Sequence, residues 1–169
     1  MAAVAKLRPL SDGRRVQLGA LDAAAAATLA PQLATIEPWV RLGTTSPDLE
    51  RLFLCATRPG RQGWCIRVDE QAAGAMIVEH NWLLGPYLMH LSVAPAYQRQ
   101  GLARRSLGWW ETVARGHGAR NLWLCVSSFN DPAKALYQAK GFRQVGVLDN
   151  LLVEGFDEVL MRKRLELPS

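Results

Sequence analysis

The second half of the chain alternates between short apolar runs and longer segments of helical periodicity. Residues 87–93 (YLMHLSV) predict a strand that stops before Pro95, and residues 121–126 (NLWLCV) predict a second strand rich in large apolar side chains. Between them, apolar residues recur at roughly helical spacing from Gly101 to Gly116. A strand, a helix and a returning strand of this kind form a right-handed crossover. The alternation therefore predicts an α/β fold with a mixed sheet.

The other segments add strands and helices on both sides of this unit. Two helix starts carry an N-cap residue followed by proline, Ser46 before Pro47 and Asp131 before Pro132. The predicted strands cover residues 14–21, 63–69, 73–80, 87–93, 121–126, 142–148 and 158–164, and the predicted helices cover 23–30, 45–54, 101–116 and 131–141. The order β-α-α-β-β-β-α-β-α-β-β gives a central sheet of about six to seven strands flanked by about four helices. We expect a single domain that spans residues 1–169.

The distribution of charge limits the partners of the chain. Its formal net charge of +5 is concentrated in residues 85–169, which hold eleven basic and seven acidic side chains, so an anionic partner should meet this half. The arginines are scattered and no nucleic-acid-binding signature is present, so nucleic acid is not an expected partner. No apolar run approaches the ~20 residues of a membrane span, and no membrane association is expected.

The cysteines and histidines give no sign of a disulfide framework or a metal site. Cys55, Cys65 and Cys125 are an odd number without paired spacing, and the three histidines add no recognised metal-ligand spacing. We therefore expect no bound metal and a reducing compartment, the cytoplasm. The oligomeric state stays open, and a homodimer through an exposed strand or the tryptophan-rich helix is one option.

The chemistry of the chain centres on the junction between the strand at 87–93 and the helix that follows it. Residues 98–103 (QRQGLA) place successive backbone amides at a helix N-terminus, with small residues where a ligand can approach. Such amides and the positive end of the helix dipole bind phosphate groups, and Arg99, Arg104 and Arg105 add positive charge around the turn. An ordinary loop-to-helix junction with a glycine has the same local pattern.

The segments around this loop resemble the GNAT superfamily of acyl-CoA-dependent N-acetyltransferases, in particular its ribosomal-protein N-terminal acetyltransferases. The superfamily's Q/R-x-x-G-x-G/A loop is matched by residues 98–103 with alanine at the last position, and a later element is matched from Asn130 through Tyr137 to Phe142. The similarity is firm over residues 87–142. It implies a GNAT-type fold and an enzyme that transfers an acetyl group from acetyl-CoA to a primary amine. A module that binds acyl-CoA with little or no turnover is the alternative.

The resemblance also implies roles for individual residues. The cofactor pyrophosphate would lie on the amides of the loop, and the pantetheine and acetyl groups would lie against the strand and Asn130. The implied cofactor-binding residues are Leu91, Ser92, Val93, Arg99, Gln100, Gly101, Leu102, Ala103, Arg104 and Asn130. Tyr137 matches the tyrosine that protonates the departing CoA thiolate, a task that suits a well-placed phenol. A core tyrosine on an amphipathic helix is the other interpretation of Tyr137.

The resemblance does not identify a general base in this chain. The N-terminal acetyltransferases have glutamate where this chain has Cys125, and the histone-acetylating branch has glutamate where this chain has Tyr87. Glu79, in the neighbouring strand, is the candidate base, although acidic residues at strand ends are mostly just solvated. His90 is expected to be structural, because strand alternation places it on the face opposite Tyr87.

Two segments are candidates for the acceptor site. Glu37 and Trp39 lie between the first two helices, where the superfamily usually forms a wall of the substrate cleft, and Tyr87 is assigned to the same site. A core tryptophan after a helix-ending proline is an equally good interpretation of Trp39. The loop at 153–158 (VEGFDE) is either an acidic rim for a cationic amine or a solvated hairpin. The sequence does not choose among a protein α-amine, a lysine, a polyamine, an amino acid and an aminoglycoside.

Overall fold

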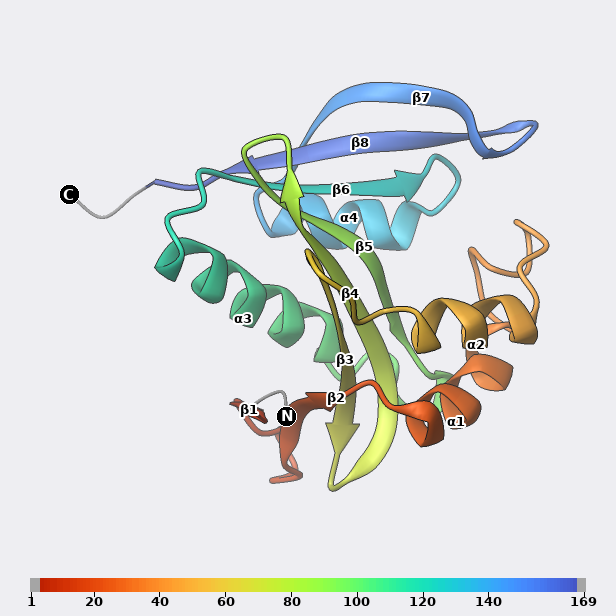
Figure 1. The fold of residues 1–169 in the computed structure, drawn as a ribbon, viewed down its shortest axis with the longest axis vertical. Helices are drawn as coiled ribbons and strands as arrows, with labels where there is room; N and C mark the ends of the chain where they lie inside the picture. Colours follow the sequence, from red (N-terminus) through yellow and green to blue (C-terminus); the bar gives the residue numbers. More distant parts are fainter. Residues whose placement is uncertain (1–3, 167–169) are drawn as a thin grey trace.

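The computed structural model describes residues 4–166, which form one eight-stranded sheet with helices on both faces (Figure 1). The strands are β1 (Ala5–Leu7), β2 (Val16–Ala20), β3 (Arg61–Val68), β4 (Gln71–Trp82), β5 (Gly85–Val93), β6 (Asn121–Ser127), β7 (Arg143–Val153) and β8 (Phe156–Arg164). The helices are α1 (Ala23–Leu33), α2 (Ser46–Leu54), α3 (Leu102–Gly116) and α4 (Asp131–Ala139), with one turn of 3-10 helix at Pro95–Tyr97. The predicted α/β fold is confirmed.

The strands follow the order β1-β2-β3-β4-β5-β6-β8-β7 across the sheet. Neighbouring strands are antiparallel except for β5 and β6, which are parallel and connected through α3 as the crossover predicts. The structure adds β1 to the predicted strands. Its three residues are too few to show an alternating pattern, and they pair with β2, with Ala5 opposite Leu18.

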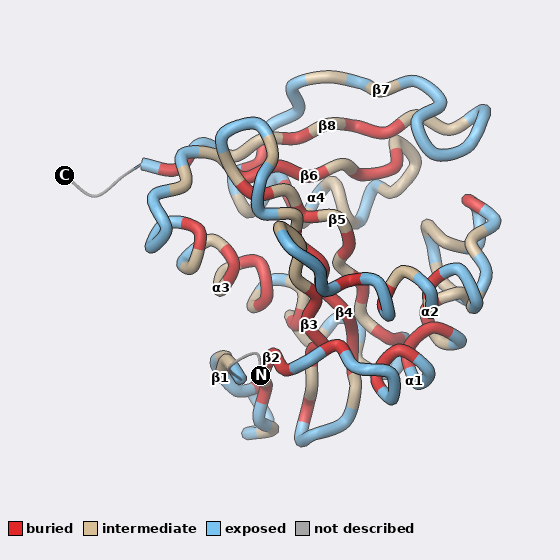
Figure 2. The backbone as a smooth tube through the Cα atoms, viewed as in Figure 1, coloured by how far each residue is buried: buried red, intermediate tan, exposed pale blue. Residues whose placement is uncertain are grey.

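Two apolar clusters fill the space between the sheet and its helices, and Figure 2 shows buried positions along the central strands and in the helices. α1 and α2 cover one face, where Leu29 and Phe53 share a cluster with Ile77 of β4. α3 and α4 cover the other face, where Trp110 and Tyr137 join a cluster built around the opposite sides of the strands. Any group that reaches from α4 to the α1–α2 side must therefore pass between two strands.

Two helices start with caps that lie one residue before the predicted ones. Thr45, not Ser46, caps α2 through a reciprocal pair of hydrogen bonds with the third residue of the helix. Asn130, not Asp131, caps α4, and its side-chain oxygen accepts a hydrogen bond from the Ala133 amide at 3.3 Å. The cap fixes Asn130 at the point where α4 begins.

β5 and β6 are paired over a short length. Tyr87 lies opposite Trp123 and Leu88 lies opposite Leu124, and the pairing of the described residues ends there. Beyond Leu88 the two strands diverge, so the edge of β5 that faces β6 has no strand partner in the described chain. This divergence opens the sheet beside the start of α4.

A β-bulge at Met89 changes which side chains share a face of β5. Across the strand pair, His90 lies opposite Ile77 and Tyr87 lies opposite Glu79, so that Met89 is the extra residue. Ile77 and Glu79 are two positions apart on β4 and point to the same face. The prediction that His90 lies on the face opposite Tyr87 is therefore wrong, because the bulge restores both residues to one face.

Candidate active site

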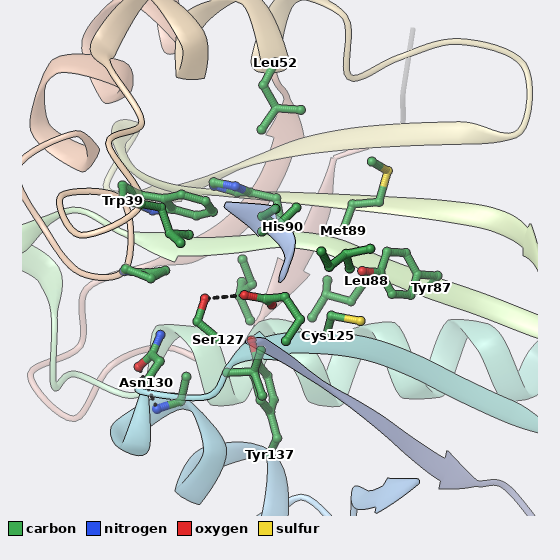
Figure 3. A pocket seen from close by; sticks show the side chains of 18 residues that line it. Trp39, Leu52, Tyr87, Leu88, Met89, His90, Cys125, Ser127, Asn130 and Tyr137 are labelled. Carbon is green, nitrogen blue, oxygen red and sulfur yellow. Dashed lines mark hydrogen bonds between the residues drawn. The ribbon is translucent and has the colours of Figure 1, made fainter. Parts of the chain in front are cut away.

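A cleft opens where β5 and β6 separate, and its inner part has a volume of about 310 Å³. Trp39 lies on one side of it, and Tyr137 rises from α4 on the other (Figure 3). The lining is mostly apolar, and its polar side chains are Tyr87, His90, Cys125, Ser127, Asn130, Tyr137 and Glu158. The inner part can therefore hold a small group among a few side chains that form hydrogen bonds.

An outer part of about 630 Å³ continues the cleft along the start of α3. The two parts share Trp39, Leu91 and Asn130 in their walls. The outer part is also lined by Ser92, Val93, Gln98, Arg99, Gly101, Leu102, Ala103 and Arg104. One continuous cleft thus runs from the predicted phosphate loop to Tyr137.

The loop presents free backbone amides to the outer part of the cleft. Gly101 is the residue before α3, has a φ of +77°, and provides no side-chain cap for the first amides of the helix. Those amides have no partners within the helix, and they lie at the positive end of its dipole. The geometry is that of an anion site of the size of a phosphate group.

Gln100 and Arg105 hold the loop in shape from outside the cleft. The Gln100 side chain accepts a hydrogen bond from Arg14 at 2.8 Å. The Arg105 guanidinium donates to three backbone carbonyls, one of them that of Gln100 at 2.9 Å. Of the three arginines near the turn, Arg99 and Arg104 line the cleft, whereas Arg105 is engaged with the protein itself.

Tyr137 has the environment of a proton donor. Its side chain is buried, lines the inner part of the cleft and packs edge-to-face against Phe142 with ring centroids 6.0 Å apart. Burial raises the pKa of Tyr137 to about 12. The phenol therefore keeps its proton at neutral pH and is present in the cleft as a neutral donor.

Asn130 lines both parts of the cleft. Its carboxamide oxygen is used in the cap of α4. The carboxamide NH₂ group has no hydrogen-bond acceptor among the described residues, so it is free to donate to a ligand in the cleft.

Glu158 is a buried carboxylate at the inner part of the cleft, with 4% of its surface exposed. The Ser127 hydroxyl donates to its Oε1 at 2.6 Å (dashed in Figure 3). Burial raises the pKa of Glu158, and the hydrogen bond from Ser127 offsets part of that increase. In the sequence, Glu158 lies where the loop at 153–158 meets the last predicted strand. Its position in the cleft depends on the pairing of β8 with β6, where Glu158 lies opposite Ser127.

Tyr87 and Cys125, the two positions at which the resemblance implies a glutamate, are occupied by neutral side chains. The Tyr87 and Cys125 side chains both line the inner part of the cleft. Burial raises the pKa of each group. Neither side chain therefore provides a carboxylate-like base near neutral pH.

The structure does not bring Glu79 together with Tyr137. Glu79 forms ion pairs with Arg61 at 3.2 Å and with Arg58 at 3.7 Å, and it lines neither part of the cleft. These contacts give Glu79 a structural explanation that does not involve the reaction.

Trp39 forms a wall of the cleft by stacking on His90, with ring centroids 5.0 Å apart and planes 14° from parallel. The His90 Nε2 atom is 2.6 Å from the Ser92 hydroxyl, while its Nδ1 atom is buried with no hydrogen-bond partner among residues 4–166. Burial lowers the pKa of His90 to about 3, so the ring is neutral. Glu37 lines the outer part of the cleft and pairs with Arg41 at 3.3 Å.

Two further features of the described residues bear on the partners of the chain. Across residues 4–166, none of the helices combines the length and apolar character that a membrane crossing needs. Within the same residues, histidine, cysteine, aspartate and glutamate side chains do not gather in groups of three or more that could hold a metal ion.

Known proteins share both the sequence pattern and the fold. Residues 31–142 match a family profile described as the acetyltransferase (GNAT) family. N-alpha-acetyltransferase RimI of Mycobacterium tuberculosis is 40% identical over 85 residues, which are 49% of this chain and 52% of that protein. The ribosomal protein bS18-alanine N-acetyltransferase of Escherichia coli (strain K12) is 38% identical over 63 residues, which are 37% of this chain and 43% of that protein. The chain thus spans about half the length of these relatives.

A solved structure extends the similarity of fold to most of the chain. The crystal structure of the ribosomal-protein-S18-alanine N-acetyltransferase from Escherichia coli has a TM-score of 0.72 and 24% identity, and the match covers 91% of this chain and 96% of that one. The chain therefore has the same fold as that enzyme.

Proposed function

Because the chain belongs to the acetyltransferase (GNAT) family, we propose that it transfers an acetyl group from acetyl-CoA to a primary amine by direct attack. The observation that carries the proposal is the continuous cleft that joins the free amides at Gly101 to the buried phenol of Tyr137. We propose that residues 1–169 act as a single N-acetyltransferase domain.

The residues of the outer cleft fit acetyl-CoA. The amides from Arg99 to Arg104 would hold the pyrophosphate, since they begin a helix and are not capped by a side chain. The unpaired edge of β5 at residues 91–93 would hold the pantetheine arm as an added strand, and the Asn130 NH₂ group would donate to the arm. Gln100 would contribute its backbone alone, because its side chain is engaged with Arg14. Bound acetyl-CoA supplies the acyl group as a reactive thioester.

The side chains of the inner cleft would carry the reaction. Backbone amides of β5 beyond Leu88 would stabilise the negative charge that develops on the carbonyl oxygen during attack. Tyr137 would give its hydroxyl proton to the departing thiolate, because the phenol is protonated at neutral pH and lies in the inner part of the cleft where the thiolate would form. Trp39, Glu37 and Tyr87 would shape the space for the acceptor.

The remaining partners follow the same proposal. The protein would work without a metal or nucleic acid, in the reducing environment of the cytoplasm, where its three free cysteines are stable. A homodimer stays a prediction, and the exposed side chains of Val145 and Val147 on edge strand β7 offer one surface for it.

The test is release of CoA thiol from acetyl-CoA in the presence of an amine panel. The panel contains an alanine-starting peptide, an N-acetylated peptide with one lysine, spermidine, free alanine and an aminoglycoside. The α-amine peptide is the first acceptor to test, because one relative is named as a ribosomal-protein alanine N-acetyltransferase and another as an N-alpha-acetyltransferase. Binding of acetyl-CoA without turnover of any amine would favour the alternative, an acyl-CoA-binding or sensing module.

A further inference from the structure

Direct attack requires an amine without its extra proton, and Cys125 and Tyr87 cannot take that proton as a carboxylate would, because burial raises the pKa of both groups. The base must then come from another element. Glu37 and Glu158 are the carboxylates that line the cleft in the described part of the chain. Glu37 is exposed at the outer part and paired with Arg41. Glu158 lies at the inner part, which it shares with Tyr137.

We propose that Glu158 is the general base of the reaction, that it takes a proton from the acceptor ammonium, and that Ser127 positions its carboxylate. The inference rests on the proposed acetyl transfer and names the residue that activates the amine. It assigns catalysis to β8, the strand that pairs with β6 on the side away from β5.

The hydrogen bonds of Glu158 leave one oxygen for the substrate. Ser127 donates to Oε1 at 2.6 Å and fixes the plane of the carboxylate. Oε2 has no hydrogen-bond partner among the described residues, and it is not among the polar atoms that are enclosed without one. Oε2 therefore keeps contact with the cleft and can accept a proton there. A single fixed oxygen is the arrangement that a general base needs.

The surroundings of Glu158 favour binding of an ammonium group, and they raise the pKa of the Glu158 carboxyl group. The groups that face it are Tyr87 of β5, Cys125 and Ser127 of β6, and, across the inner cleft, His90 and Tyr137. All of these are neutral near pH 7. The walls of the inner part contain no lysine or arginine from residues 4–166, so the carboxylate is the one fixed charge that meets a cation there. Its raised pKa brings the base closer to the pH at which proton transfer is efficient.

The proton balance of the step is complete. Oε2 of Glu158 takes one proton from R–NH₃⁺, and the lone pair of the resulting R–NH₂ forms the bond to the acetyl carbon. The carbon–sulfur bond breaks, its electron pair stays on sulfur, and the sulfur takes the hydroxyl proton of Tyr137. The new amide nitrogen gives its surplus proton back to the tyrosine oxygen. Glu158 then releases its proton to solvent, so one amide, one CoA thiol and one proton are formed.

The test compares Glu158→Gln with the wild type, using acetyl-CoA and the panel amine that the wild type turns over fastest. Glutamine keeps the size of the side chain and still accepts from Ser127, but it takes no proton. We expect kcat at pH 7 to fall by about 10²–10⁴-fold, with the KM for acetyl-CoA within twofold of the wild type. The wild-type kcat should rise with pH to a plateau, whereas the variant should keep rising as free amine becomes more abundant.

Two further variants distinguish a role of Glu158 as a general base from a purely structural role. Ser127→Ala removes the hydrogen bond that lowers the pKa of Glu158, so the acidic limb of the kcat profile should move to higher pH while the plateau is retained. Asp149→Asn removes an exposed carboxylate from neighbouring β7 and should leave the profile unchanged. A structural role for Glu158 would not move the limb in the Ser127 variant.

A second readout does not depend on activity. Because burial raises the folded-state pKa of Glu158, the stability associated with its protonated form is present at low pH and is lost as pH rises through that pKa. Glu158→Gln should therefore melt increasingly above the wild type as pH rises. An unchanged acidic limb in Glu158→Gln, or a kcat within twofold of the wild type, would overturn the assignment while leaving acetyl transfer intact. Failure of the wild type to turn over any amine would overturn the proposed function and this inference with it.

Discussion

Replacement of Gly101 by alanine tests the loop at the start of α3 with the smallest change that the position permits. At a φ of +77° an L-residue costs about 1–2 kcal/mol. The new Cβ would lie 2.6 Å from Arg105 Nη1, closer than van der Waals contact. Moving that guanidinium weakens its hydrogen bond to the Gln100 carbonyl, which is worth a further ~1 kcal/mol. The combined penalty is about 2–3 kcal/mol.

The penalty lowers either the free energy of unfolding or the affinity for acetyl-CoA, depending on whether the loop keeps its shape in the variant. If the loop keeps its shape, the free energy of unfolding falls by the full amount and Tm falls by roughly 4–12 °C. If the loop relaxes, its amides no longer converge, and the Kd for acetyl-CoA rises by about 30–140-fold. Calorimetric titration and a thermal melt of one preparation measure both quantities, and their free-energy changes should sum to about 2–3 kcal/mol.

Gly116→Ala is the matched control at the other end of α3. A Cβ there meets nothing within 4 Å, and the backbone does not adopt a positive φ. Alanine in a helix should raise stability by about 0.5–1 kcal/mol and leave the Kd unchanged. The account of the loop is refuted if Gly101→Ala has the Tm and the Kd of the wild type.

Three further predictions concern the rest of the cleft and the cysteines. Tyr137→Phe should lower kcat by about 10²–10⁴-fold with an unchanged Kd for acetyl-CoA, and a kcat within twofold of the wild type would exclude Tyr137 as the acid. Asn130→Asp keeps a good helix cap but loses the NH₂ donor, so a thermal melt should show near-normal stability while calorimetry shows weaker binding of acetyl-CoA; unchanged affinity would contradict the contact with pantetheine. Addition of reductant should not lower Tm, because Cys55, Cys65 and Cys125 are free thiols, and a clear drop would reveal a structural disulfide.

The features that sequence reasoning found are those whose residues are close together in the chain. The phosphate loop lies within residues 98–104, and Asn130 and Tyr137 are spaced along one helix. Local rules for helix starts, caps and glycine are enough to place such groups. The predicted caps of α2 and α4 are each one residue later than the caps in the structure. Two neighbouring polar residues can both act as a cap, and the local backbone geometry decides which of them does.

The features that sequence reasoning missed depend on how distant segments pair. An acidic rim was one option for the loop at 153–158, but the loop could not single out Glu158, which faces Ser127 because β8 lies in register beside β6. His90 shares a face with Tyr87 because of an unpaired residue at Met89, and simple alternation cannot reveal a bulge. Glu79 is adjacent to Tyr87 in the sheet, but its arginine partners were not foreseen.

The central claim is that the cleft between β5 and β6 is the place where an acetyl group passes from acetyl-CoA to an amine. The direct measurement is mass spectrometry of each panel amine after incubation with the protein and acetyl-CoA, together with the amount of CoA thiol released. We predict an acetylated amine formed in equal amount to the thiol, and its near-complete loss when Tyr137 is replaced by phenylalanine. Tight binding of acetyl-CoA with no acetylated product from any amine of the panel would contradict the claim.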